Sequence, residues 1–261
     1  MTAGFEPAIL TSPSGPTHGP AASVLALGAP GALTAQVFWN SPERPGAAPG
    51  VVDATVDERL AATRRWQITS AESWLHVTDR FIRGEHIRSR PAETALDVRD
   101  AVLEENGAAY LSVGDWIDAV DEQGRRAGWD EARTALVLRL AVKAFHAEQQ
   151  LAEDGLLPAG RRVVTMFAYD LAHASYLIHA GARLGYSDPQ TVQQMHQALA
   201  HNASAVYTSW QDYAAAYVLG HSLLEGGYPS DEVYRSAAAT AKLLLSSPLS
   251  PWTNIGFPGR G

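Results

Sequence analysis

The stretch FAYDLAHASYLIHAGARLGY, from Phe167 to Tyr186, predicts one long helix built almost entirely of apolar or small residues. A rotation of 100° per residue divides this helix into two sides. The side expected to be buried holds Met166, Asp170, Ala174, Leu177 and Gly181, and the side expected to face solvent holds Thr165, Ala172, Ser175, His179 and Arg183. Gly181 predicts that a second helix crosses closely on the buried side.

A charged group lies on the predicted buried side of this helix. Asp170 requires a partner there, because an unpaired buried carboxylate is costly. His173 follows Asp170 by one turn, close enough to interact with it. The sequence therefore predicts either a structural hydrogen bond or a polar group that faces a ligand.

A second helix is predicted to begin at Trp210, after the capping residue Ser209, in SWQDYAAAYVLGHSLLEGG. Its inward stripe is predicted to consist of Trp210, Tyr213, Tyr217, Gly220 and Leu224, with Gln211, Ser222 and Glu225 outward. His221 lies at the edge of the stripe, one turn after Tyr217. Three aromatic residues and a histidine place several side-chain hydrogen-bonding groups on one helical face.

These two helices leave two interpretations open. Buried Asp, His and Tyr side chains satisfy one another in many protein cores, so the groups can be purely structural. Alternatively, Asp170 orients His173 for acid–base chemistry in a pocket, and His221 is a second acid, base or donor. The walls of such a pocket are predicted to be Tyr169, Trp210, Tyr213, Tyr217 and Trp252. A cavity of roughly 300 Å³ or more lined by both histidines favours the pocket.

The remainder of the chain predicts an all-α protein. Residues 51–261 show helical periodicity and no convincing alternating strand pattern, and we expect a single globular domain of about seven helices. Residues 1–50 contain eight of the 15 prolines together with many glycines. We expect this segment to be a flexible or extended arm.

Composition excludes several classes of function. A net charge of −8 without any basic run disfavours nucleic acid and anionic membranes as partners. The absence of cysteine excludes disulfides and thiol catalysis, and fits a cytoplasmic location. We find neither a signal peptide nor an apolar run of about 20 residues, the length required to span a bilayer. Phosphate-loop, dinucleotide and zinc-hydrolase motifs are also absent, so we expect no cofactor and no metal.

Four segments together resemble a bacterial family known as domain of unknown function 1266. They are WQITSAESWL, FAYDLAHASYLIHAGARLGYSD, YTSWQDYAAAYVLGHSLLEGG and LLLSSPLSPWTNIGF, which span residues 66–257 in the family's order. Tyr169 stands where the family usually has Trp, and His173 and His221 stand where it usually has Arg. The resemblance implies an architecture and site positions, but no chemistry.

Two functions therefore follow as hypotheses. The first is a cytoplasmic helical protein with a polar-floored small-molecule pocket, including an enzyme that uses an Asp-oriented histidine. The alternative is a non-catalytic interaction module, such as a regulator or an immunity-type partner of another protein. Substrate, reaction and oligomeric state are not specified by the sequence.

Overall fold

A computed structural model describes residues 8–48, 52–224 and 232–259. These residues form helices and connecting segments without strands, so the predicted all-α class is confirmed. In chain order the elements are α1 (Gly19–Leu25), η1 (Ala26–Gly28), α2 (Ala29–Ala35), α3 (Val56–Trp66), α4 (Ala71–Ile82), α5 (Glu85–Arg88), α6 (Pro91–Asn106), α7 (Val113–Ala127), α8 (Glu131–Glu153), α9 (Phe167–Leu184), α10 (Pro189–Val206), α11 (Trp210–Leu224), α12 (Glu232–Ser246) and α13 (Pro251–Asn254). The predicted number of about seven helices is wrong, since several short helices were not expected.

Contacts between residues divide the chain into two compact units. The first unit comprises residues 1–84, 170–210 and 243–261, and the second comprises residues 85–169 and 211–242. Helices α9, α11 and α12 each contribute residues to both units. None of the helices in the described part of the chain has the length and apolar character needed to cross a bilayer.

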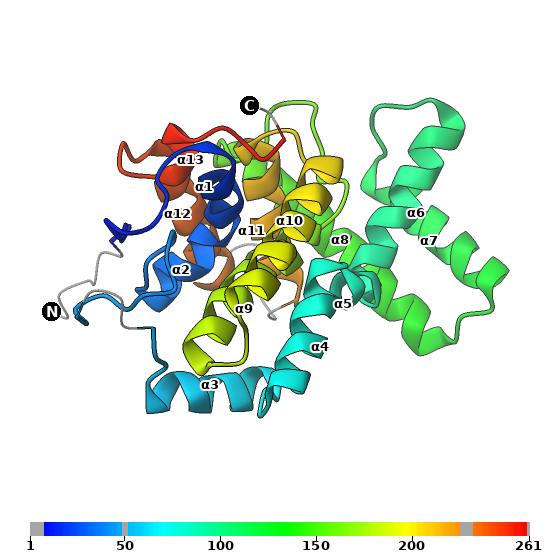
Figure 1. Ribbon diagram of the computed structural model, residues 1–261. Coiled ribbons are helices and arrows are strands. Elements are labelled where there is room, and N and C mark those ends of the chain that lie inside the picture. The colour runs from blue at the N-terminus through cyan, green and yellow to red at the C-terminus, as the bar shows by residue number, and fades with distance from the viewer. Residues whose placement is uncertain (1–7, 49–51, 225–231, 260–261) are drawn as a thin grey trace, which may run out of the picture. The chain divides into compact units, whose positions relative to one another are not determined.

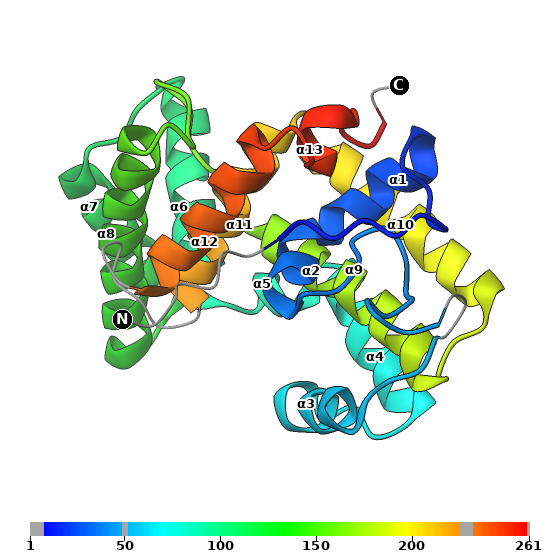
Figure 2. The same cartoon turned by 90° about the vertical axis from the view of Figure 1, so that its left-hand side faces the viewer.

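In the first unit, α9 packs closely against α4. Gly181 of α9 faces the indole of Trp74, as the predicted close crossing requires. The Trp74 Nε1 atom donates a hydrogen bond of 2.7 Å to the backbone oxygen of Leu177. α10 begins at Pro189 after the capping residue Asp188, and it packs on both α1 and α4 (Figures 1 and 2).

The prediction of a flexible or extended N-terminal arm is wrong for the described residues 8–48. Pro20 and Pro30 lie in the first turns of α1 and α2, where a missing N–H costs nothing, so these prolines begin helices. The residues buried in this segment include Ala22, Ala26, Leu27, Leu33 and Trp39. Asn40 joins the two ends of this segment: its side-chain oxygen accepts from the Ser12 N–H, and its side-chain nitrogen donates to the Ser12 oxygen.

The side of α9 that was predicted to face solvent is also buried. Ala172, Ser175, His179 and Arg183 are all buried, as are Asp170 and the other residues of the side predicted to be inward. The N-terminal segment covers this side: Gly28 lies against Ser175, and Gly31 lies against Tyr176. The two errors have one cause, because the segment expected to be an arm covers the face expected to be exposed.

In the second unit, α6, α7 and α8 pack pairwise against one another (Figures 1 and 2). Buried Trp116 of α7 joins α7 to α6 through a 2.9 Å hydrogen bond from its Nε1 atom to the Ala95 oxygen. α11 contributes the buried residues Tyr213 and Tyr217, as predicted. Ser222, predicted to point outward, is instead fully buried, whereas Glu225 lies outside the described residues.

Candidate functional site

Asp170 is fully buried in α9, which confirms its predicted environment. His173 is half-buried in an aromatic cluster with residues of α3 and α4. Its ring stacks on Phe81 with centroids 5.7 Å apart and meets the edge of Trp66 at 5.2 Å. Arg65 Nη2 lies 3.5 Å from His173 Nε2. An acid–base pair of Asp170 and His173 stays a prediction.

Three of the predicted residues meet within the second unit. The ring of His221 lies 4.9 Å from that of Tyr169 and 4.5 Å from that of Tyr217. Tyr169 also stacks on His86, at 5.9 Å. Gly220 permits this packing, because a Cβ atom there would lie 2.7 Å from the Cβ atom of Tyr169.

The two tryptophans predicted as pocket walls meet within the first unit. Trp210 and Trp252 stack with centroids 5.2 Å apart. Their indole nitrogens donate to backbone oxygens: Trp210 to Ile255 at 2.7 Å and Trp252 to Ala26 at 2.8 Å. Stacked tryptophans whose indole N–H groups are bonded to backbone oxygens are typical of a protein core. Of the eight predicted site residues, Asp170, His173, Trp210 and Trp252 belong to the first unit, and Tyr169, Tyr213, Tyr217 and His221 belong to the second.

A different pair of histidines lines a cavity of about 580 Å³ in the first unit. His179 of α9 and His196 of α10 lie on one wall, with ring centroids 5.7 Å apart and ring planes nearly perpendicular. The remaining surface is mainly aliphatic and includes Val24, Leu25, Pro42, Ala182, Val192 and Ala200. The cavity therefore combines apolar walls with two imidazoles.

Both histidines are held in the neutral form near pH 7. Burial lowers the pKa of His196 to about 4. Burial also lowers the pKa of His179 well below its ordinary value, and the neighbouring His196 and Arg183 groups add to this effect. A neutral imidazole offers one donor and one acceptor. The Nε2 atom of His196 is buried and has no hydrogen-bond partner within the described residues, so it is available to a ligand in the cavity.

Arg183 contributes a buried charge one turn beyond His179. Its Nε atom donates to Glu58 Oε1 at 2.7 Å, and Glu58 also completes the N-terminal capping box of α3. Its Nη1 and Nη2 atoms are buried without a hydrogen-bond partner among the described residues. The guanidinium thus places positive charge beside His179, which opposes protonation of the imidazole.

This pair of histidines was not predicted from the sequence. His179 was assigned to solvent, and no role was predicted for His196. One signal was present: α9 is apolar or small on almost all sides, and a helix of that kind is buried all round. The described residues contain no group of three or more acidic or histidine side chains arranged to hold a metal ion.

The fold and the cavity define an all-helical protein with two neutral histidines beside an apolar chamber. The sequence model of the family described as "Protein of unknown function (DUF1266)" matches residues 63–257. The chain belongs to this family. The matched residues include α4 to α13, whereas α1 and α2 lie outside them. No curated protein matches the chain, and no solved structure matches it.

Proposed function

We propose that this protein binds a small, largely apolar molecule with one hydrogen-bonding group in the cavity of the first unit. The observation that carries this proposal is the presence of two neutral histidines on the wall of a chamber of about 580 Å³. Small-molecule sites in proteins usually have volumes of roughly 300–1,000 Å³, apolar walls and a few polar groups. The cavity has all three properties.

The charge state of the histidines favours a neutral ligand group. A neutral imidazole can donate a hydrogen bond to a carbonyl oxygen or accept one from a hydroxyl group. A phenol, alcohol or amide on an apolar body fits this pair. Such a ligand gains both from burial of its apolar surface and from a hydrogen bond to an imidazole.

The same charge state favours binding over catalysis at this cavity. A general base is most effective when its pKa lies near the working pH, and the pKa of His196 is about 4. Acid–base chemistry by Asp170, His173 and His221 is a separate hypothesis that concerns other parts of the fold. Small-molecule binding in a cytoplasmic protein is therefore the function that we propose.

The test is a titration of the full chain with 2-naphthol, a neutral probe with an apolar body and one hydroxyl group. We expect calorimetry to detect binding with Kd below about 1 mM. His196→Leu removes one hydrogen-bonding ring and is expected to weaken binding by roughly three- to tenfold, the usual contribution of one neutral hydrogen bond. Ala200→Phe fills part of the cavity and is expected to abolish binding.

Ala198→Phe is the matched control, because Ala198 is exposed on the same helix. This variant should bind 2-naphthol as the parent does. If the parent does not bind the probe, or if all three variants bind it equally, the cavity is not a ligand site. The non-catalytic interaction module then becomes the better hypothesis.

A further inference from the structure

A second cavity, of about 320 Å³, lies wholly within the second unit. It is bounded by the segment between α6 and α7, by α8, and by the segment between α8 and α9. These three parts contribute Tyr110 and Leu111, Phe145 and Gln149, and Arg161 and Arg162, respectively. Tyr110 is 69% exposed, so one aromatic wall of the cavity is open to solvent.

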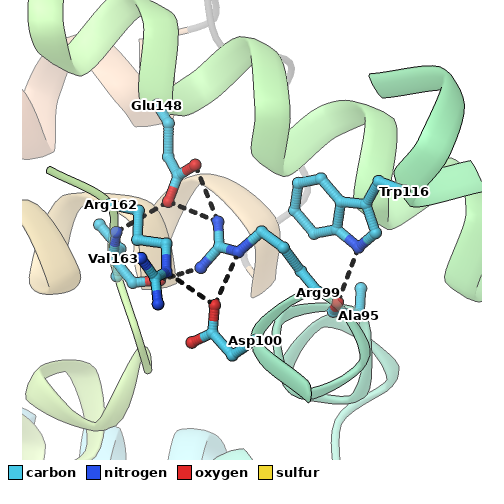
Figure 3. Close-up of polar contacts among 7 residues, drawn as sticks. All are labelled: Ala95, Arg99, Asp100, Trp116, Glu148, Arg162 and Val163. Carbon is cyan, nitrogen blue, oxygen red and sulfur yellow. Dashed lines mark hydrogen bonds and ion pairs between the residues drawn. The ribbon is translucent and has the colours of Figure 1, made fainter. Parts of the chain in front are cut away.

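Arg99 lines this cavity and is only 4% exposed. Figure 3 shows the polar contacts that surround it. Its Nη1 atom lies 2.9 Å from both carboxylate oxygens of Glu148, and its Nε atom donates to Asp100 at 3.0 Å. Its Nη2 atom donates to the Val163 oxygen at 2.6 Å, and its guanidinium lies over the ring of Trp116. Each nitrogen of Arg99 is engaged, so this charge has a structural role.

The Arg99 network fixes the segment that carries the neighbouring arginines. The Val163 N–H donates to Glu148 Oε1 at 2.8 Å, which attaches the segment to α8. Arg162 Nε donates to Asp100 Oδ1 at 2.9 Å, beside Arg99 (Figure 3). The backbone that presents Arg161 and Arg162 is therefore held in place before any ligand arrives.

Arg161 and Arg162 keep unused donors at the edge of the cavity. Among the described residues, Arg162 makes side-chain hydrogen bonds only through its Nε atom, and its side chain is 38% exposed. Arg161 makes one long contact of 3.4 Å from Nη2 to Asp212, and its side chain is 60% exposed. A guanidinium has five N–H donors, so most donors of both arginines are available.

The residues that line the cavity carry three arginines and one glutamate, and the carboxylates of Asp100 and Asp212 contact Arg162 and Arg161 from outside the lining. Trp116, Phe145 and Tyr110 supply aromatic surface next to the guanidinium groups. Aromatic rings favour flat apolar groups, and guanidinium groups bind carboxylates and phosphates. We propose that this cavity binds a small organic anion with a flat apolar body, whose charge contacts Arg161 and Arg162.

The test compares three probes on the full chain at low salt: 1-naphthoate, 1-naphthyl phosphate and the neutral 1-naphthamide. We expect at least one anion to bind with Kd below about 1 mM, and the amide to bind at least about tenfold more weakly. The anion that binds more tightly identifies the preferred group as a carboxylate or a phosphate. Arg161→Gln and Arg162→Gln should each weaken anion binding about fivefold or more, since each removes charge-assisted hydrogen bonds.

Arg126→Gln is the matched control, because Arg126 is 71% exposed and pairs with Glu122 on the surface of α7. It should leave anion binding unchanged, and so should Ala200→Phe in the first unit. Arg161→Gln keeps the test decisive if Arg162→Gln disturbs the Asp100 contact. The proposal is overturned if neither anion binds below about 1 mM, if the amide binds equally well, or if Arg161→Gln has no effect.

Discussion

Gly181 lies directly against the indole of Trp74, so closely that a Cβ atom at position 181 would lie 2.1 Å from Trp74 Cε2. The indole is fully buried, and its N–H is bonded to the oxygen of Leu177 one turn earlier on α9. The ring therefore has neither room to move away nor a free donor to exchange. The contact fixes the distance between α4 and α9.

Gly181→Ala is expected to destabilise the protein by about 1–3 kcal/mol or more, the usual cost of overpacking a rigid core. The measurement is chemical denaturation of the variant beside the parent. Gly114→Ala is the control, because the only neighbour near its Cβ position is Ser112 Oγ at 3.7 Å. That variant should be neutral or slightly stabilised, as expected for Gly→Ala in a helix with free space. Equal effects of the two variants would contradict the close crossing.

Removal of residues 1–35 is expected to lower the thermal midpoint by about 10 °C or more. The deletion takes away the buried residues Leu27 and Leu33, each worth roughly 1.5–3 kcal/mol of burial, and about 1 kcal/mol moves a domain of this size by 2–4 °C. Differential scanning calorimetry provides the measurement.

Trp252→Phe is a useful companion to the deletion. It removes the indole donor to Ala26 together with the pyrrole part of the ring, and it keeps a six-membered ring to stack on Trp210. It should cost far less than the deletion, about 1 kcal/mol for one lost hydrogen bond, because the Ala26 oxygen still accepts from the Ala29 N–H. If the truncated chain has the same thermal midpoint as the parent, the interpretation of residues 8–48 as a dispensable arm is restored.

Titration of His196 should make stability depend on pH. Its pKa is about 4 in the folded protein and near 6.5 when unfolded, so below pH 6.5 the unfolded chain binds a proton that the folded protein does not. The stability contribution is thus complete above pH 6.5 and is lost as the pH falls towards 4. Between about pH 7 and pH 5 this linkage removes about 2 kcal/mol of unfolding free energy.

The variant His196→Gln lacks this titration. Its unfolding free energy is therefore expected to fall by about 2 kcal/mol less than that of the parent between pH 7 and pH 5. His201→Gln serves as the control, because His201 is exposed on the same helix, and it should retain the parent's dependence. Urea denaturation at several pH values measures both. An unchanged slope in His196→Gln would show that this imidazole is not buried in its neutral form.

Features set by neighbouring residues were predictable from the sequence. The start of α10 at Pro189 follows from the preceding Asp188, whose carboxylate accepts hydrogen bonds from the N–H groups of Gln190 and Thr191. The start of α11 at Trp210 and the burial of Asp170 were predicted correctly. Each depends on capping or on helical periodicity, which act over a few residues.

The candidate site was not predictable in the same way. His179 lines a cavity only because the segment around α1 covers its side of α9. Periodicity identifies two sides of a helix, but not which segment elsewhere in the chain covers each side. The prolines were interpreted as helix breakers, although proline in a first turn favours helix formation. Because of that interpretation, neither the packing of the N-terminal segment on α9 nor the cavity that it encloses was predicted.

The hydrogen bond from Trp252 to Ala26 joins residues 226 positions apart in the chain. The first unit is built from three separate stretches of sequence, whereas the second unit is complete by residue 242. During synthesis, both stretches of the second unit, residues 85–169 and 211–242, are therefore complete before Trp252 is available to bond Ala26. Contacts of such long sequence separation form slowly, because a large loop must first be closed. The N-terminal helices are translated first and reach their final packing last.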